Sequence, residues 1–158
     1  MHIKLATVAD LDKMVALSYE KRRSYEIVQP IFWKYAGSAG DKVQKQWFEE
    51  LMQKNDYILM VYEENDKILG FVIGRIMKAP EVYDPGGLTL MIDDFCIAKE
   101  LSWNLVGKEL IDEIKILGVK NGATQLLVVS DAHDEEKNKF LSKIDLSIAS
   151  YWYTGSVF

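Results

Sequence analysis

The spacing of apolar residues changes twice along this chain, and these changes constrain the fold more than any other feature. Apolar residues recur every three or four positions as far as Met52, lie in dense runs from Tyr57 to Ala98, and return to the wider spacing from Val106. The wide spacing is typical of an amphipathic helix, and short dense runs are typical of buried β-strands. The sequence therefore predicts helices before and after a central group of strands.

The central strands are expected to lie side by side. Residues 57–62 and 68–77 are joined by turn-forming residues at 64–66, which favours an antiparallel hairpin. A third apolar run, 88–98, follows a turn at residues 83–87. These three runs predict an antiparallel sheet.

The remaining segments complete the predicted order β-α-α-β-β-β-α-β-α-β. Helices are expected at 11–25, 43–52, 104–122 and 134–144, and further strands at 3–6, 125–130 and 146–158. This order combines a meander with one strand-helix-strand crossover. We therefore expect an α+β fold, a mixed, mostly antiparallel central sheet flanked by helices, in a single domain of residues 1–158.

Composition argues against several classes of protein. The net charge of -5 disfavours a surface built to attract nucleic acid or anionic lipid. One cysteine and two histidines are too few for a disulfide framework, a Ser-His-Asp relay or a histidine-rich metal site. With no signal peptide and no apolar run of about 18 residues, we expect a cytoplasmic protein with no metal, no nucleic acid and no membrane partner.

Three segments, 3–10, 68–72 and 91–97, together with Gly107 at a helix start, resemble the GNAT-type acyl-CoA N-acyltransferases, and the resemblance covers nearly the whole chain. It implies the GNAT-like fold, with acetyl-CoA or another acyl-CoA as co-substrate. It also implies direct transfer of the acyl group to an amine of a small acceptor. The alternative is an inactive acyl-CoA-binding or interaction module, because Leu105, Asp134 and Leu141 depart from the family pattern.

The resemblance assigns an acyl-CoA site. In the family the acidic strand holds the pantetheine arm, and the next loop and helix start hold the diphosphate, where unpaired amide hydrogens can bind phosphate. Alternatively, Leu105 and Val106 are core residues and Gly107 permits close packing. Asp134 replaces an asparagine that commonly contacts the cofactor. The expected cofactor-binding residues are Phe95, Cys96, Ile97, Trp103, Asn104, Leu105, Val106, Gly107, Lys108 and Asp134.

Asp93 and Asp94 are the candidate catalytic residues. An amine must lose a proton to form the amide, and a carboxylate can accept it. By resemblance, Asp93 occupies the position of the strand carboxylate that serves as base. Consecutive strand residues face opposite ways, so we expect one acid in the cleft and the other on another layer. A negative site would favour a cationic amine; alternatively, both acids pair with Lys or Arg at the sheet rim.

The expected substrate-binding residues are mostly aromatic. Tyr25, Phe32 and Trp33, with Glu26 as partner for a cation, fall where the family places a lid over the acceptor, and Tyr83 is added to this set. Packing between two helices explains the same aromatic residues equally well.

Two other segments yield predictions. The basic run 21–23 is interpreted as a solvated helix face. The tail after residue 146 supplies one strand where the family usually has two. The sheet edge left open in this way predicts a homodimer.

Overall fold

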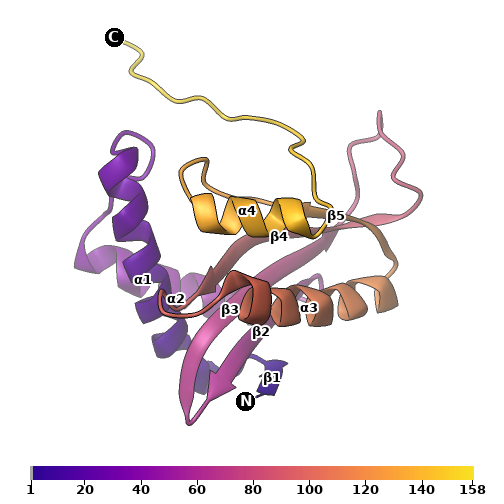
Figure 1. The fold of residues 1–158 in the computed structure, drawn as a ribbon, viewed down its shortest axis with the longest axis horizontal. Helices are drawn as coiled ribbons and strands as arrows, with labels where there is room; N and C mark the ends of the chain where they lie inside the picture. Colours follow the sequence, from indigo (N-terminus) through magenta and orange to yellow (C-terminus); the bar gives the residue numbers. More distant parts are fainter. Residues whose placement is uncertain (1) are drawn as a thin grey trace.

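The computed structural model describes residues 2–158, in which a five-stranded sheet lies between two layers of helices (Figure 1). The strands are β1 (His2–Leu5), β2 (Tyr57–Glu64), β3 (Lys67–Met77), β4 (Leu88–Ile97) and β5 (Ala123–Val128). The helices are α1 (Leu11–Val28), α2 (Ser38–Met52), α3 (Lys108–Lys120) and α4 (Glu135–Lys143), with a 3-10 turn, η1 (Val8–Asp10), and a π-helical turn, η2 (Trp103–Gly107).

The sheet order is β1-β2-β3-β4-β5, antiparallel from β1 to β4 and parallel between β4 and β5. The predicted α+β class with a mixed, mostly antiparallel sheet is therefore confirmed. The hairpin between β2 and β3 is also confirmed: Asn65 and Asp66 both have positive φ, 49° and 61°. Two consecutive positive φ values give the turn a twist that matches the strands.

Apolar residues on the two faces of the sheet form two cores. Met60, Val72 and Phe95 face α3 and α4, whereas Val61, Phe71 and Cys96 face α1 and α2. Because successive strand residues point to opposite faces, a dense apolar run fills both cores. The β2 and β3 runs read from the sequence are therefore strands buried on both sides.

The β4 and β5 strands pair over only half of β4. Their parallel ladder runs from Leu88 to Ile92, and the last contact is the Val129 amide donating to the Ile92 carbonyl at 2.8 Å. On its other edge β4 shifts register against β3, so that Ile73 faces Asp94 and Gly74 faces Ile92. Asp93 is thus the extra residue of a β-bulge, located where β5 separates from β4.

The predicted end of α1 and the predicted C-terminal strand have different outcomes. The helix expected at 11–25 continues to Val28 and ends before Pro30, because the residue before a proline is disfavoured in the helical conformation. The predicted strand at 146–158 is wrong, since residues 147–158 form neither strand nor helix. In Figure 1 this tail runs away from the sheet. The segment carries strand-forming residues, yet no strand among residues 2–158 pairs with it. Within residues 2–158, no helix is both long and apolar enough to span a bilayer.

Candidate functional site

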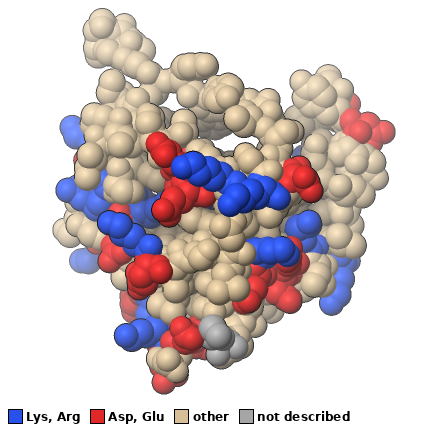
Figure 2. Space-filling model, in the orientation of Figure 1, with Lys and Arg blue, Asp and Glu red and all other residues tan. Residues whose placement is uncertain are grey.

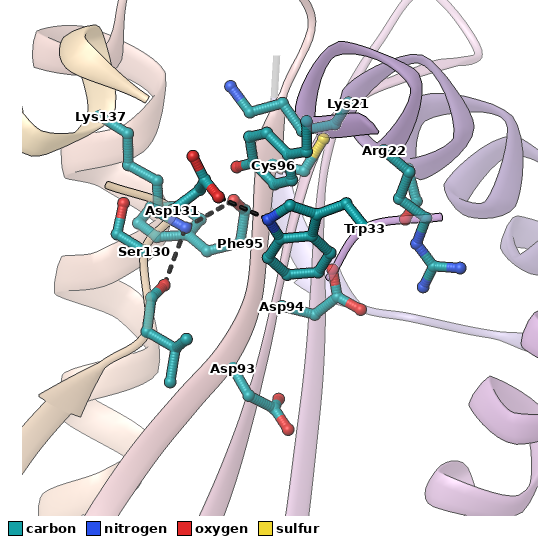
Figure 3. Close-up of a pocket in the computed structure, with 13 residues that line it drawn as sticks. Lys21, Arg22, Trp33, Asp93, Asp94, Phe95, Cys96, Ser130, Asp131 and Lys137 are labelled. Atoms are coloured by element: carbon teal, nitrogen blue, oxygen red, sulfur yellow. Dashed lines mark hydrogen bonds between the residues drawn. The ribbon is translucent and has the colours of Figure 1, made fainter. Parts of the chain in front are cut away.

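A cavity of about 130 Å³ lies where β4 and β5 separate, under the C-terminal half of α1 and beside α4 (Figure 3). Its wall carries equal numbers of acidic and basic side chains: Asp93, Asp94, Asp131, Lys21, Arg22 and Lys137. Charged groups that meet in a confined space shift one another's pKa values and are typical of reactive sites.

Both predicted catalytic acids line this cavity, which corrects the expectation that only one would. The bulge is the reason. Ile92 and Phe95 both face the α3 and α4 core although three positions separate them. The two aspartates between them therefore share the cavity side of the strand. Figure 3 shows Asp94 beside Trp33 and Arg22, with Asp93 lower and pointing away from them.

Burial sets the protonation of Asp94. Desolvation raises its carboxyl pKa from 3.8 to about 6, and the positive charge of Arg22 offsets part of that rise. Desolvation also raises the pKa of Asp93, whose side chain is more exposed. Asp94 therefore changes its charge close to neutral pH, as a proton-accepting group must.

Lys137 bridges the opening between the two strands. Its Nζ donates to the Phe95 carbonyl of β4 at 3.2 Å and to the Val129 carbonyl just after β5 at 3.1 Å. The residue is only 3% exposed, and burial lowers the pKa of its ammonium group to about 8. The sequence prediction missed this residue. The available signal was its spacing, because Lys137 lies on the inward stripe of α4 with Phe140 and Leu141.

The interpretation of the basic run 21–23 as a solvated helix face is wrong for two of its three residues. Lys21 and Arg22 line the cavity, and only Arg23 is exposed. Lys21 Nζ lies 2.7 Å from an oxygen of Asp134, which also accepts a hydrogen bond from the Tyr25 hydroxyl at 2.9 Å. The signal was again helical spacing, because these bases continue the buried stripe of α1.

The predicted acceptor residues separate into two groups. Tyr25 and Trp33 line the cavity, with ring centroids 5.2 Å apart, and Trp33 Nε1 donates to Asp131 at 2.6 Å. Phe32 packs edge-on against Trp33 but is half exposed. Glu26 instead accepts the Tyr35 amide at 3.1 Å, and Tyr83 lies exposed on the loop before β4. Neither Glu26 nor Tyr83 is at the cavity.

The predicted diphosphate loop folds as the turn η2, and none of residues 103–108 lines the cavity. The Leu105 and Val106 amides both donate to the Ser102 carbonyl, at 3.1 and 3.0 Å. The expected diphosphate site needs unpaired amide hydrogens at residues 104–108. Those of Leu105, Val106 and Lys108 already donate hydrogen bonds within this turn. The alternative interpretation is confirmed for Val106, which is 2% exposed and lies in the core, but it is wrong for Leu105, which is 58% exposed.

Gly107 permits close packing. A Cβ at this position would lie 2.7 Å from Cε3 of Trp103, so only glycine fits without a shift. The Trp103 ring is buried, stacks on Phe140 at 5.7 Å and meets Phe95 edge-on at 4.9 Å. Trp103 and Gly107 thus join η2 to the core formed by β4 and α4.

The other predicted cofactor contacts come from β4 and α4. Phe95 and Cys96 line the cavity, whereas Ile97 lies in the core. The buried Cys96 thiol points to the Leu17 carbonyl at 3.6 Å, and burial raises its pKa to about 12, so it is a packing residue rather than a nucleophile. The Asp134 carboxylate caps α4 by accepting the Lys137 amide.

Solved structures share this fold. A mutant of the BH1408 protein from Bacillus halodurans has a TM-score of 0.85 at 14% identity, with all of both chains covered. An aminoglycoside N-acetyltransferase in complex with CoA has a TM-score of 0.74 at 12% identity, covering 98% of this chain and 93% of its own. A predicted acetyltransferase from Clostridium acetobutylicum, with acetyl-CoA, has a TM-score of 0.73 at 15% identity, covering 99% and 96%.

At such low identity these structures establish the fold alone, and it is the fold found in GNAT-type acetyltransferases. No protein-family model matches the chain, and no curated protein matches it.

Proposed function

We propose that the protein is an acyl-CoA-dependent N-acyltransferase, with acetyl-CoA or another acyl-CoA as co-substrate, that acylates an amine of a small acceptor directly. The proposal rests mainly on one observation. A carboxylate with a pKa of about 6, Asp94, lines the cavity that opens between β4 and β5. The shared fold of the CoA and acetyl-CoA complexes adds support.

The polar groups around the cavity suit a thioester. Beyond Ile92, no strand of the described chain pairs with β4 on the β5 side. The buried Ser130 hydroxyl, on the cavity wall, has no hydrogen-bond partner within residues 2–158, so it is available to a ligand. Outside the cavity, at η2, the amide hydrogens of Trp103 and Asn104 precede the partnered ones and have no acceptor within residues 2–158. Two free amides at a helix start suit a diphosphate oxygen.

In the proposed reaction the amine nitrogen attacks the thioester carbon, the carbon–sulfur bond breaks, and an amide forms. Asp94 accepts the proton that the amine loses. Lys137 uses two of its hydrogens on the Phe95 and Val129 carbonyls, so the third is available to the leaving sulfur. An ammonium with a pKa of about 8 is well matched to protonating a thiolate near neutral pH. Lys137 is thus the proposed general acid of the reaction.

The charge of the cavity bears on the acceptor. Its wall carries three acids and three bases, so the total charge does not by itself select a cation. The exposed acid, Asp93, would contact a second positive charge on the acceptor. We therefore infer a small primary amine, with diamines preferred over monoamines.

Release of free coenzyme A thiol tests the proposal. The chain is mixed with acetyl-CoA and a panel of diamines, monoamines and aminoglycosides, with the corresponding alcohols as blanks. Asp94→Asn should lower turnover by about 10²–10⁴-fold. The matched control is Asp112→Asn, which changes an exposed acid on α3 and should leave turnover unchanged. No thiol release with any amine would reject the proposal.

A second candidate is a module that binds acyl-CoA or a partner without catalysis. The specific observation is that Lys137 ties together the strands between which a thioester would lie, while Leu141 brings no hydroxyl group. Calorimetry separates the candidates. Acetyl-CoA binding without turnover indicates the binding module, and no CoA binding together with a stable protein partner indicates an interaction protein.

A further inference from the structure

The Lys137 side chain brings a primary amine into the cavity. The residue lies on α4, is 3% exposed and lines the cavity wall. The proposed reaction uses this group only in its charged form, as an acid. The uncharged form of the same amine is a nucleophile, and desolvation is one way in which proteins activate a lysine. The two forms therefore allow two different reactions with a thioester.

Two hydrogen bonds fix the direction of the reactive position on Lys137. Besides its bond to the side chain, Nζ has three positions, and two of them hold the hydrogens donated to the Phe95 and Val129 carbonyls. The third position carries a hydrogen in the ammonium form and the lone pair in the neutral form. Loss of the proton thus keeps both hydrogen bonds and places a nucleophilic lone pair where the donor was.

This lone pair is within reach of the thioester carbon. In the proposed function, on which this step rests, the leaving sulfur lies at the third position of Nζ. The carbon that an acceptor amine attacks is bonded directly to that sulfur. A nitrogen that can donate to the sulfur therefore needs only a small displacement to contact the carbon, and such proximity accelerates a reaction strongly.

The surroundings maintain the neutral amine near neutral pH. Burial has the largest effect and lowers the pKa of the Lys137 ammonium group to about 8, and Lys21 lowers it further. Interactions with Asp134, Asp94 and Cys96 act in the opposite direction. The other charged groups on the cavity wall are Arg22, Asp93 and Asp131. At about pH 8 about half of the Lys137 amine is neutral, against less than about 1% for a lysine with the unperturbed pKa of about 10.4.

The cavity also offers room and a hydrogen-bond donor. Its volume of about 130 Å³ is many times the roughly 10–15 Å³ that one water molecule needs, so the three non-hydrogen atoms of an acetyl group fit. The Ser130 hydroxyl is buried on the same wall and has no partner within residues 2–158. Figure 3 shows Ser130 on the same side of the cavity as Lys137, where its hydroxyl can donate to the acetyl oxygen.

We propose that bound acyl-CoA acylates Lys137 itself when no acceptor amine is present. The Lys137 nitrogen attacks the thioester carbon, the carbon–sulfur bond breaks, and its electron pair leaves with the sulfur. The nitrogen loses one hydrogen as a proton, which the thiolate takes. The products are an N-acyl lysine and free coenzyme A thiol, so no further reactant is needed. Acylation removes the positive charge, and the modified protein thus lacks its proposed general acid.

Mass spectrometry of the full chain tests this modification. The chain is incubated with acetyl-CoA and no amine, and peptide mapping locates the acetyl group. We expect one acetyl group, on Lys137, added at a rate that rises about tenfold per pH unit up to about pH 8 and is constant above it. Figure 2 shows Lys and Arg side chains spread over the surface, so peptides with exposed lysines give a comparison within each sample.

Two lysine variants complete the test. Lys137→Arg keeps hydrogen-bond donors but should gain no acetyl group at this position. The matched control is Lys139→Arg, which changes a lysine of α4 whose side chain is 73% exposed and should be acetylated on Lys137 as fast as the wild type. The peptide map of the wild type gives the position of the acetyl group even if Lys137→Arg does not fold.

Thiol release with the amine panel, measured on the same samples, separates this proposal from the proposed function. Acylated amines with an unmodified Lys137 would overturn the modification and leave the acyltransferase standing. An acetylated Lys137 with no acylated amine would support the modification and reject the acyltransferase. Exposed lysines acetylated as fast as Lys137 would overturn the proposal, because they would indicate unselective chemical acetylation. With neither reaction, both proposals fail.

Discussion

Replacing Asp94 with asparagine should make the protein more stable while it removes the proposed activity. The folded state holds this carboxyl at a pKa of about 6, against 3.8 for an unperturbed one. The difference of about two units corresponds to about 3 kcal/mol at 1.36 kcal/mol per unit. Because Asp94 is partly exposed, solvent screening reduces the expected gain in the free energy of unfolding to about 2 kcal/mol.

The sign of the effect depends on pH. As pH rises above about 4, the unfolded carboxyl ionises while the folded one keeps its proton, so the stability of the wild type falls until about pH 6. Asparagine does not ionise. The gain from Asp94→Asn should therefore be small at about pH 4 and complete at about pH 8.

Urea unfolding followed by tryptophan fluorescence at these two pH values measures the difference. Asp112→Asn on the exposed face of α3 should show no such pH-dependent gain. An equal gain at both pH values would refute the reasoning, because it would mean that the carboxylate charge is not the cause. A loss at about pH 8 would show that the attraction to Arg22 exceeds the desolvation penalty.

Three further predictions use other parts of the structure. Turnover should rise near pH 6 as Asp94 ionises and fall near pH 8 as Lys137 loses its proton. Lys137→Met should slow turnover and abolish the fall at alkaline pH. An unchanged pH profile in this variant would exclude Lys137 as the acid. Gly107→Ala should lower stability by about 1–3 kcal/mol in thermal unfolding because its Cβ meets Trp103, while Gly40→Ala in α2, with a nearest contact of 3.4 Å, should not. The Cys96 thiol should resist a thiol reagent at about pH 8 until the protein unfolds, and reaction in the native state would contradict its burial.

Local residue patterns account for most of the fold. The β2–β3 hairpin follows from two dense apolar runs around a turn that needs left-handed residues, which Asn65 and Asp66 supply. The four helices follow from their spacing and from local end signals such as Pro30 and Asp134. Such signals depend on neighbours within a few positions, so they can be read without knowing the tertiary structure.

The candidate site was only partly predictable. Asp93 and Asp94 are visible in the sequence because adjacent acids interrupt an apolar strand. The sequence does not reveal the bulge that turns both towards one cavity, because a bulge is set by pairing with β3. The sequence does not reveal the roles of Lys137 and Arg22 either, because the groups that surround their side chains come from distant elements.

By itself, then, the sequence determined the element types, their order and the acidic interruption of β4, because each depends on short-range periodicity and turn chemistry. The tertiary structure decided three things. It set the separation of β4 from β5, the protonation of the groups buried there, and the failure of residues 147–158 to pair within their own chain. Each of these depends on which segments meet in space, and a strand in particular exists only where another backbone offers it hydrogen bonds.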